Sequence, residues 1–204
     1  PWAARYSISN DRGAGAFTWR ADSNAFVYAA VHLVNQFNFW SDIYMHVIDG
    51  GTSQLTNGAR ARDPDFSPDG SRLLYVTNRA QNNQLEVMTV DRRRDTLTEN
   101  TDHTQYGAPR FSPDGEVIAL SVWQDGRRDL WLYSRDGEPL RRLTSDSAID
   151  SEPTWSADGK WLYFTSDRTG IPNVFAIDLD TEHLWQVTNV VTGAARPSLR
   201  KDGK

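Results

Sequence analysis

Ser67-Pro68-Asp69-Gly70 is the stretch that decides the fold, because it returns at a fixed period. It recurs as Ser112-Pro113-Asp114-Gly115, then as Ser156-Ala157-Asp158-Gly159, and fades into Arg200-Lys201-Asp202-Gly203. The steps from Asp69 through Asp114 and Asp158 to Asp202 are 45, 44 and 44 residues. A repeat of this length is typical of propeller and solenoid proteins, in which each repeat is one structural unit.

The four residues have the chemistry of a tight turn. Proline presets φ, aspartate can bind backbone N–H groups of its own turn, and glycine tolerates a positive φ. Each copy follows an apolar residue and precedes an apolar run, which predicts a β-hairpin turn. The alternative, a calcium site made by the repeated aspartates, lacks the clustered oxygen ligands that calcium needs.

Each repeat contains four short runs of β-branched, aromatic or alternating residues, which predict four antiparallel strands. One such unit cannot cover its own apolar faces and must pack on its neighbours. We therefore predict an all-β fold, a β-propeller of four-stranded antiparallel blades, rather than a sheet-rich solenoid. The single domain is expected to be a fragment of a larger propeller, with four blades and the start of a fifth. The expected blades are 14–57, 62–101, 106–146 and 150–190, and the next begins at 195–204.

Composition excludes several classes of protein. The 204 residues are 24% charged and 11% aromatic, which predicts a folded chain. The net charge of −5 argues against nucleic-acid binding, and the run Arg92-Arg93-Arg94 is flanked by Asp91 and Asp95, as in a solvated turn. No apolar run approaches the roughly 20 residues of a membrane span. Without cysteine, neither a disulfide nor a thiolate site can form.

The sequence offers no recognisable catalytic or metal-binding motif. It contains no Gly-x-Ser-x-Gly elbow and no phosphate-binding loop. Its four histidines are scattered, whereas metal sites need convergent ligands. We predict no catalytic residue, no cofactor and no metal in this stretch, and favour a chain that is not itself an enzyme.

The loops that enter the first strand of each repeat are the first candidate binding region. In a propeller these loops surround one mouth of the central channel, and loops on a rigid frame often carry function. The alternative is a solvated rim. The candidates are Arg62, Asp63, Tyr106, Arg110, Asp150, Glu152 and Arg196.

An apolar loop in the first repeat is the second candidate. From Tyr28 to Ile43 the chain takes 15 residues, where the other repeats take 10. The extra residues belong to an expected loop at Ala29–Asp42, which contains Phe37, Phe39 and Trp40. Exposed aromatic residues of this kind suit a protein partner. The alternative is that the loop folds back over its own blade.

The repeat resembles that of TolB-type, WD40-like propellers over about residues 15–204. The third repeat shows the pattern in Ala108–Gly115, Asp129-Leu130-Trp131-Leu132, Asp136-Gly137 and Arg141-Arg142-Leu143-Thr144, and the fourth in Ser151–Trp155. The Trp-Asp dipeptide of true WD40 blades is missing. The resemblance implies a periplasmic or otherwise extracytoplasmic protein. The family includes scaffold proteins and propeller domains attached to peptidases and amidohydrolases.

These observations predict a non-catalytic protein-interaction scaffold that binds a protein or peptide at the channel mouth and on exposed loops. The alternative is the propeller domain of a larger hydrolase or lyase, whose catalytic residues lie outside this stretch. We also expect self-association, because terminal blades would expose apolar faces and strand edges.

Overall fold

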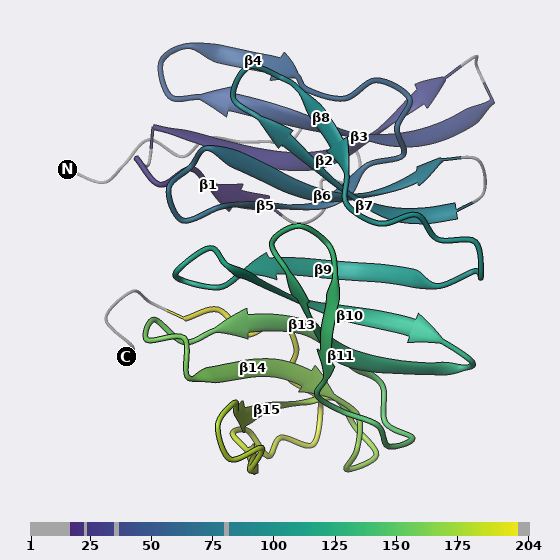
Figure 1. The fold of residues 1–204 in the computed structure, drawn as a ribbon, viewed down its shortest axis with the longest axis vertical. Coiled ribbons are helices and arrows are strands. Elements are labelled where there is room, and N and C mark those ends of the chain that lie inside the picture. Colours follow the sequence, from purple (N-terminus) through teal and green to yellow (C-terminus); the bar gives the residue numbers. More distant parts are fainter. Residues whose placement is uncertain (1–16, 23, 35–36, 80–81, 200–204) are drawn as a thin grey trace.

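The fold is a stack of four β-sheets (Figure 1). The computed structural model describes residues 17–22, 24–34, 37–79 and 82–199. In this part of the chain all regular structure is β, and each sheet has four antiparallel strands in chain order. The predicted fold class is confirmed. Within the same residues no helix is long and apolar enough to cross a membrane.

The sheets, numbered as blades 1 to 4, divide the strands evenly. Blade 1 contains β1 (Phe17–Trp19), β2 (Ala25–Val34), β3 (Asn38–Val47) and β4 (Gly51–Gln54). Blade 2 contains β5 (Arg62–Phe66), β6 (Arg72–Arg79), β7 (Asn82–Thr89) and β8 (Arg94–Thr96). Blade 3 contains β9 (Gln105–Phe111), β10 (Val117–Gln124), β11 (Arg127–Ser134) and β12 (Pro139–Arg142). Blade 4 contains β13 (Asp150–Trp155), β14 (Trp161–Ser166), β15 (Asn173–Asp178) and β16 (Leu184–Gln186).

The recurring Ser-Pro-Asp-Gly turn is held by its own aspartate. In blade 2 the Ser67 hydroxyl donates to Asp69 Oδ1 at 2.5 Å, and the Ser71 N–H donates to the same oxygen at 3.0 Å. Gly70 takes φ 70°. The hydrogen bond from Ser67 is the main cause that lowers the pKa of Asp69 to about 2. Asp114 and Asp158 accept the equivalent bonds, so the aspartate acts within the turn, as expected.

A threonine after each outermost strand joins it to the third strand. In blade 1 the Ile43 N–H donates to Thr56 Oγ1 at 2.9 Å, and the Thr56 hydroxyl donates to buried Asp42. The bond from the third strand recurs in every blade. The other acceptors are Thr98, Thr144 and Thr188. This bond explains the threonine in the Arg-Leu-Thr element of the repeat.

Apolar clusters lie between consecutive blades and hold the stack together. Each pair of adjacent blades shares a cluster, centred on Ile43 and Tyr75, on Leu85 and Leu120, and on Leu130 and Phe164. The hairpin tip of blade 3 approaches blade 2 very closely at Gly137. A Cβ atom at this position would lie 2.2 Å from the Leu97 carbonyl oxygen. Blade packing therefore depends on that glycine.

The predicted loop Ala29–Asp42 was wrong, because most of it belongs to two long strands. β2 and β3 pair in continuous register from Ala29 opposite Ile43 to Val34 opposite Asn38. The alternating β-branched and aromatic residues of this stretch favour an extended hairpin over a loop. We call residues 31–34 and 37–41 the arm.

Candidate functional site

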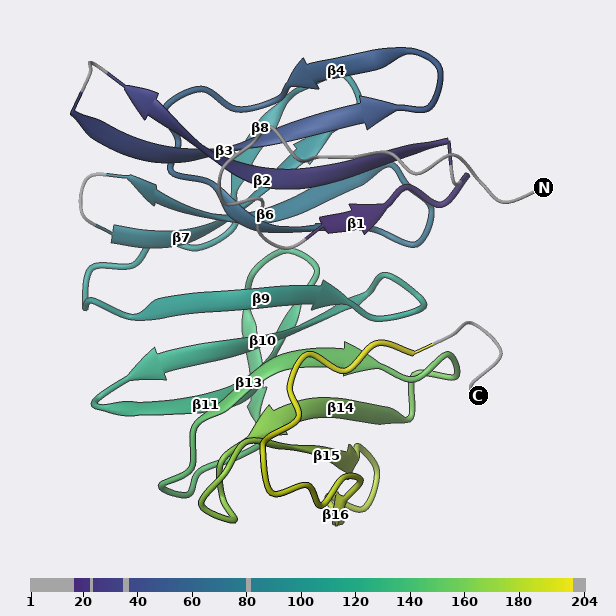
Figure 2. The same ribbon diagram turned by 180° about the vertical axis from the view of Figure 1, so that it is seen from behind.

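The first strand of each blade lines one shared hollow of about 570 Å³. These strands are β1, β5, β9 and β13. Residues 196–198 complete the wall, and this last part of the described chain, yellow in Figure 2, runs beside β13. The lining residues are Phe17, Thr18, Trp19, Asp63, Ala108, Arg110, Glu152, Pro153, Thr154, Arg196, Pro197 and Ser198.

Four of these residues occupy one repeated backbone position, which we call the ring. They are Asp63, Ala108, Glu152 and Arg196, with φ of 53°, 45°, 56° and 58°. Each precedes a proline, and three of them lie where the strand register shifts. Such a bulge re-aims a side chain, and a positive φ costs a non-glycine residue energy. The ring is thus a strained feature directed at the hollow.

Acidic residues of the ring hold the next blade in place. Asp63 Oδ2 accepts the Ala108 N–H at 3.2 Å. Glu152 accepts the Arg196 N–H at 3.0 Å and the Arg196 Nε–H at 2.8 Å. The hydrogen bond to Glu152, followed by the Glu152 charge, raises the pKa of Arg196, and Asp63 contributes through its charge. Charges from different blades therefore converge on the hollow.

A second layer of side chains lies two residues after the ring position in each strand. Asp65 accepts the Phe111 N–H at 2.9 Å and the Thr18 hydroxyl at 3.4 Å, and so joins three blades. Burial raises the pKa of Asp65 to about 6, although the nearby Arg110 charge opposes the change. Arg110 itself donates to the Pro109 carbonyl at 2.9 Å and, within the described residues, forms no ion pair with a carboxylate.

Three of the binding candidates from the loops that enter the first strands make contacts within the framework. Arg62 donates to Asp63 and to the Tyr106 carbonyl, both at 2.6 Å, and so ties β5 to β9. Tyr106 and Asp150 were expected at the surface and are buried, because their side chains point between blades. The Tyr106 hydroxyl donates to Asn100, and Asp150 accepts two hydrogen bonds from Arg168. The hollow gathers Asp63, Arg110, Glu152 and Arg196 from the predicted set.

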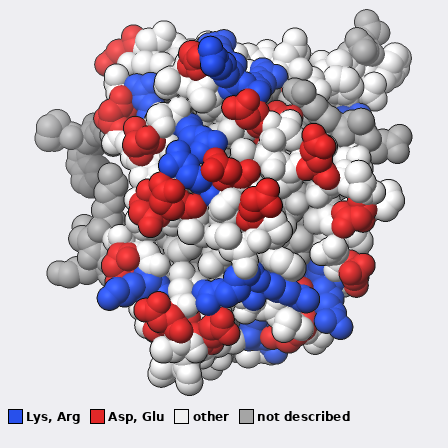
Figure 3. Space-filling model, in the orientation of Figure 1, with Lys and Arg blue, Asp and Glu red and all other residues white. Residues whose placement is uncertain are grey.

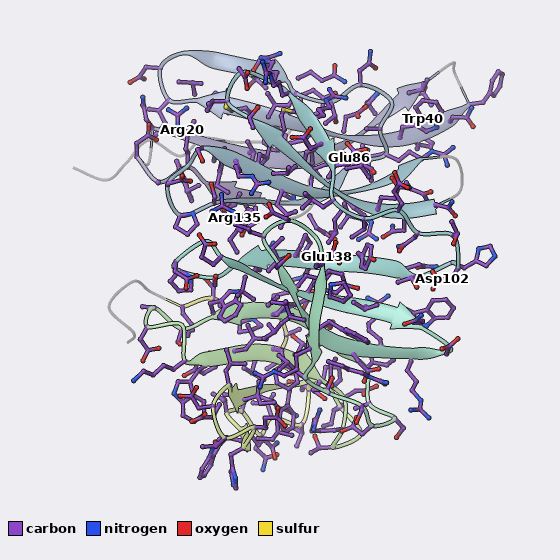
Figure 4. The ribbon with its side chains drawn as sticks, viewed as in Figure 1. Arg20, Trp40, Glu86, Asp102, Arg135 and Glu138 are labelled. Atoms are coloured by element: carbon purple, nitrogen blue, oxygen red, sulfur yellow. The ribbon has the colours of Figure 1, made fainter. Side chains whose placement is uncertain are left out.

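The arm presents two of its three predicted aromatic residues. Phe37 and Phe39 are 84% and 74% exposed. Trp40, labelled in Figure 4, is half-buried. Its ring packs on Gly58, and the ring centroid lies 5.2 Å from the Arg60 guanidinium carbon. Phe37 and Phe39 are therefore available to a partner, whereas Trp40 anchors the arm to the loop before β5.

Sequence reasoning missed Phe17 and Trp19 as walls of the hollow. They are 59% and 47% exposed on β1. A usable signal was present, since a proline follows each ring residue at intervals of 45, 44 and 44 residues. That period marks the position at which β5, β9 and β13 bulge toward the hollow.

The described residues also line two smaller hollows, of about 410 and 290 Å³, but neither gathers side chains from all four blades. In the described ranges no three His, Cys, Asp or Glu side chains are grouped so as to hold a metal ion. Acidic and basic residues are interspersed on the face in Figure 3, with a basic band across its lower part. The hollow is thus the strongest candidate site.

The model of the TolB β-propeller domain family matches residues 24–204. The chain belongs to this family. It is 34% identical to a TolB homologue of Chlorobium luteolum over 154 residues, which is 74% of the chain and 34% of that protein. It is 36% identical to the Tol-Pal system protein TolB of Anaeromyxobacter dehalogenans over 110 residues, 53% of the chain and 25% of that protein. The chain therefore spans about a third or less of these relatives.

Solved structures show the same fold. The structure of a putative TolB from Agrobacterium tumefaciens matches with a TM-score of 0.78 at 21% identity, over 92% of this chain and 66% of that one. A prolyl endopeptidase structure matches with a TM-score of 0.61 at 17% identity, over 90% of this chain and 30% of that one. At these identities the likeness concerns the fold alone.

Proposed function

We propose that this chain is a non-catalytic protein-interaction module that binds a protein or peptide at the hollow and on the arm. The observation that carries the proposal is the hollow itself. Strands from four blades deliver Asp63, Arg110 and Glu152 to one concave site, beside the exposed aromatic walls Phe17 and Trp19. Concave sites with apolar walls and a few convergent polar groups are the usual form of binding sites.

The arm supports the proposal from a second position. Phe37 and Phe39 are large, exposed apolar side chains two residues apart at the end of the long β2–β3 hairpin. Exposed aromatic residues are frequent anchors of protein interfaces. Membership of the TolB family adds weight, since one relative is named as a component of the Tol-Pal system. A periplasmic or other extracytoplasmic location is part of the proposal and rests on this family relationship.

The competing function is that of a propeller domain in a larger hydrolase or lyase. The similarity to a prolyl endopeptidase structure suggests this function, but at 17% identity the similarity concerns the fold only. The two functions differ in an observable way. A hydrolase or lyase domain in the complete protein, with its activity abolished by a change in that domain, would favour the alternative.

Site-specific photo-cross-linking tests the proposal. Benzoylphenylalanine is placed in the full chain at Phe17 in the hollow, at Phe39 on the arm, or at Val90 as control. Val90 is 74% exposed in the turn between β7 and β8. Irradiation of producing cells should give the same cross-linked protein from Phe17 and Phe39 and none from Val90. Equal products from all three positions, or none from Phe17, would contradict the proposal.

A further inference from the structure

We propose that the hollow recognises an extended peptide through an acidic side chain, aspartate or glutamate, held by Arg110 and Arg196. This inference rests on the proposed function and specifies the chemistry of the ligand. It follows from an imbalance of hydrogen-bonding groups. In the described part of the chain each carboxylate around the hollow accepts two or three hydrogen bonds from the protein, whereas each of the two guanidinium groups donates only one.

Each of the three carboxylates around the hollow already accepts at least two hydrogen bonds from the protein. Asp65 accepts one hydrogen bond at each oxygen, from Thr18 and from the Phe111 N–H. Glu152 accepts the Arg196 side chain at Oε1, and the Arg196 N–H and the Thr165 hydroxyl at Oε2. Asp63 accepts two bonds at Oδ2. A cationic ligand would have to compete with these internal donors.

The guanidinium groups have spare donors. An arginine carries five N–H donors. Arg110 uses Nη1 for the Pro109 carbonyl, and Arg196 uses Nε for Glu152. Within the described residues the Arg110 Nη2 and Arg196 Nη groups donate to no other side chain. The Arg196 side chain is 84% exposed. Such groups bind carboxylates in a planar, two-bond geometry.

The size and walls of the hollow favour a peptide segment over a small anion. Its volume of about 570 Å³ is far larger than one carboxylate needs. Phe17, Trp19 and Pro153 provide apolar contacts for the residues that flank the acid. Arg110 lies on β9, whereas Arg196 lies beyond blade 4. A segment that continues on both sides of the acid can cover more of these apolar walls than a chain terminus can.

A peptide library with matched acid and amide pairs tests the inference. A bead library of acetylated, C-terminally amidated heptapeptides is screened against the full chain. Enriched peptides are resynthesised with each Asp replaced by Asn and each Glu by Gln. We expect the acids to bind about tenfold or more tightly, as for a hydrogen bond between charged groups. Arg110→Gln should remove most of this preference and Arg110→Lys should retain part of it. Arg127→Gln, an exposed arginine on β11 outside the hollow, should leave it unchanged.

The outcomes separate this inference from the proposed function. Peptides that bind in the hollow without preferring acid over amide would refute the inference and leave the proposed function standing. Peptides that bind in the hollow should bind the Phe17→Glu variant more weakly than the wild type, and this comparison locates the binding. A preference that survives both Arg110→Gln and Arg196→Gln would also refute it. Equal binding of peptides whose only carboxylate is a free C-terminus would overturn the choice of a side chain. A library without any binder would contradict both proposals. Circular dichroism melts establish that each variant is folded.

Discussion

Gly137→Ala should destabilise the stack of blades much more than an ordinary glycine substitution. Gly137 has φ +95°, and its new Cβ would lie 2.2 Å from the Leu97 carbonyl oxygen in blade 2, closer than real Cβ contacts occur. The positive φ costs a non-glycine residue about 1–3 kcal/mol. Relief of the clash must move the hairpin tip away from blade 2, at a further cost of about 1–3 kcal/mol. The expected loss of unfolding free energy is about 2–6 kcal/mol.

Gly170→Ala is the matched control for this prediction. Gly170 has φ +92° in a blade 4 turn, and a Cβ there would meet no atom within 4 Å. It should cost only the backbone term of about 1–3 kcal/mol. Both variants are unfolded in urea, with circular dichroism as the signal. The difference between their losses of unfolding free energy gives the contribution of the contact between the blades. Equal losses would refute the argument that close packing of blade 3 on blade 2 requires a glycine.

Three further predictions concern the inner strands and the arm. Burial raises the pKa of Asp65 to about 6, above its unfolded value of about 3.9, so its contribution to stability is present at low pH and is lost as the pH rises through about 6. As the pH is lowered from 7.5 to 4.5, the unfolding free energy of the wild type, measured in urea at each pH, should therefore rise relative to that of Asp65→Asn. A difference between the two proteins that stays constant with pH would contradict this. Asp150→Ala removes the fully buried partner of Arg168, which keeps only its ion pair with Asp146, and should cost about 1–3 kcal/mol in the same assay. An unchanged unfolding free energy would show that the pair is unimportant. Phe37→Ser and Phe39→Ser should each change the unfolding free energy by less than about 0.5 kcal/mol. Trp40→Ser should cost about 2 kcal/mol, because only Trp40 packs on Gly58 and Arg60. Equal shifts of the melting temperature for all three variants would mean that the whole arm is core.

Most of the fold could be predicted from the repeated turn. Ser67, Asp69 and Gly70 bond only within a few residues, so their structure is local and their period exposes the blades. The arm was missed because a change in spacing was interpreted as a loop. Alternation at Val31 and Leu33 gives the strand signal, but strand pairing there depends on the partner residues of β3.

The candidate site was only partly predictable for a similar reason. Asp63, Glu152 and Arg196 could be placed near one mouth, because they occupy the same position in successive repeats. Tyr106 and Asp150 lie close to that position in the sequence, yet they turn inward. Their direction is set by Asn100 and Arg168, which lie in other segments and which local sequence does not identify as partners.

The measurement that tests the central claim most directly is NMR mapping of the binding site. An enriched heptapeptide, or the partner captured by cross-linking, is titrated into the isotope-labelled full chain, and backbone amide shifts are followed. Binding at the hollow predicts the largest changes at Ala108, Arg110, Glu152 and Arg196. Changes confined to the outermost strands β4, β8, β12 and β16, with these four amides unmoved, would contradict it.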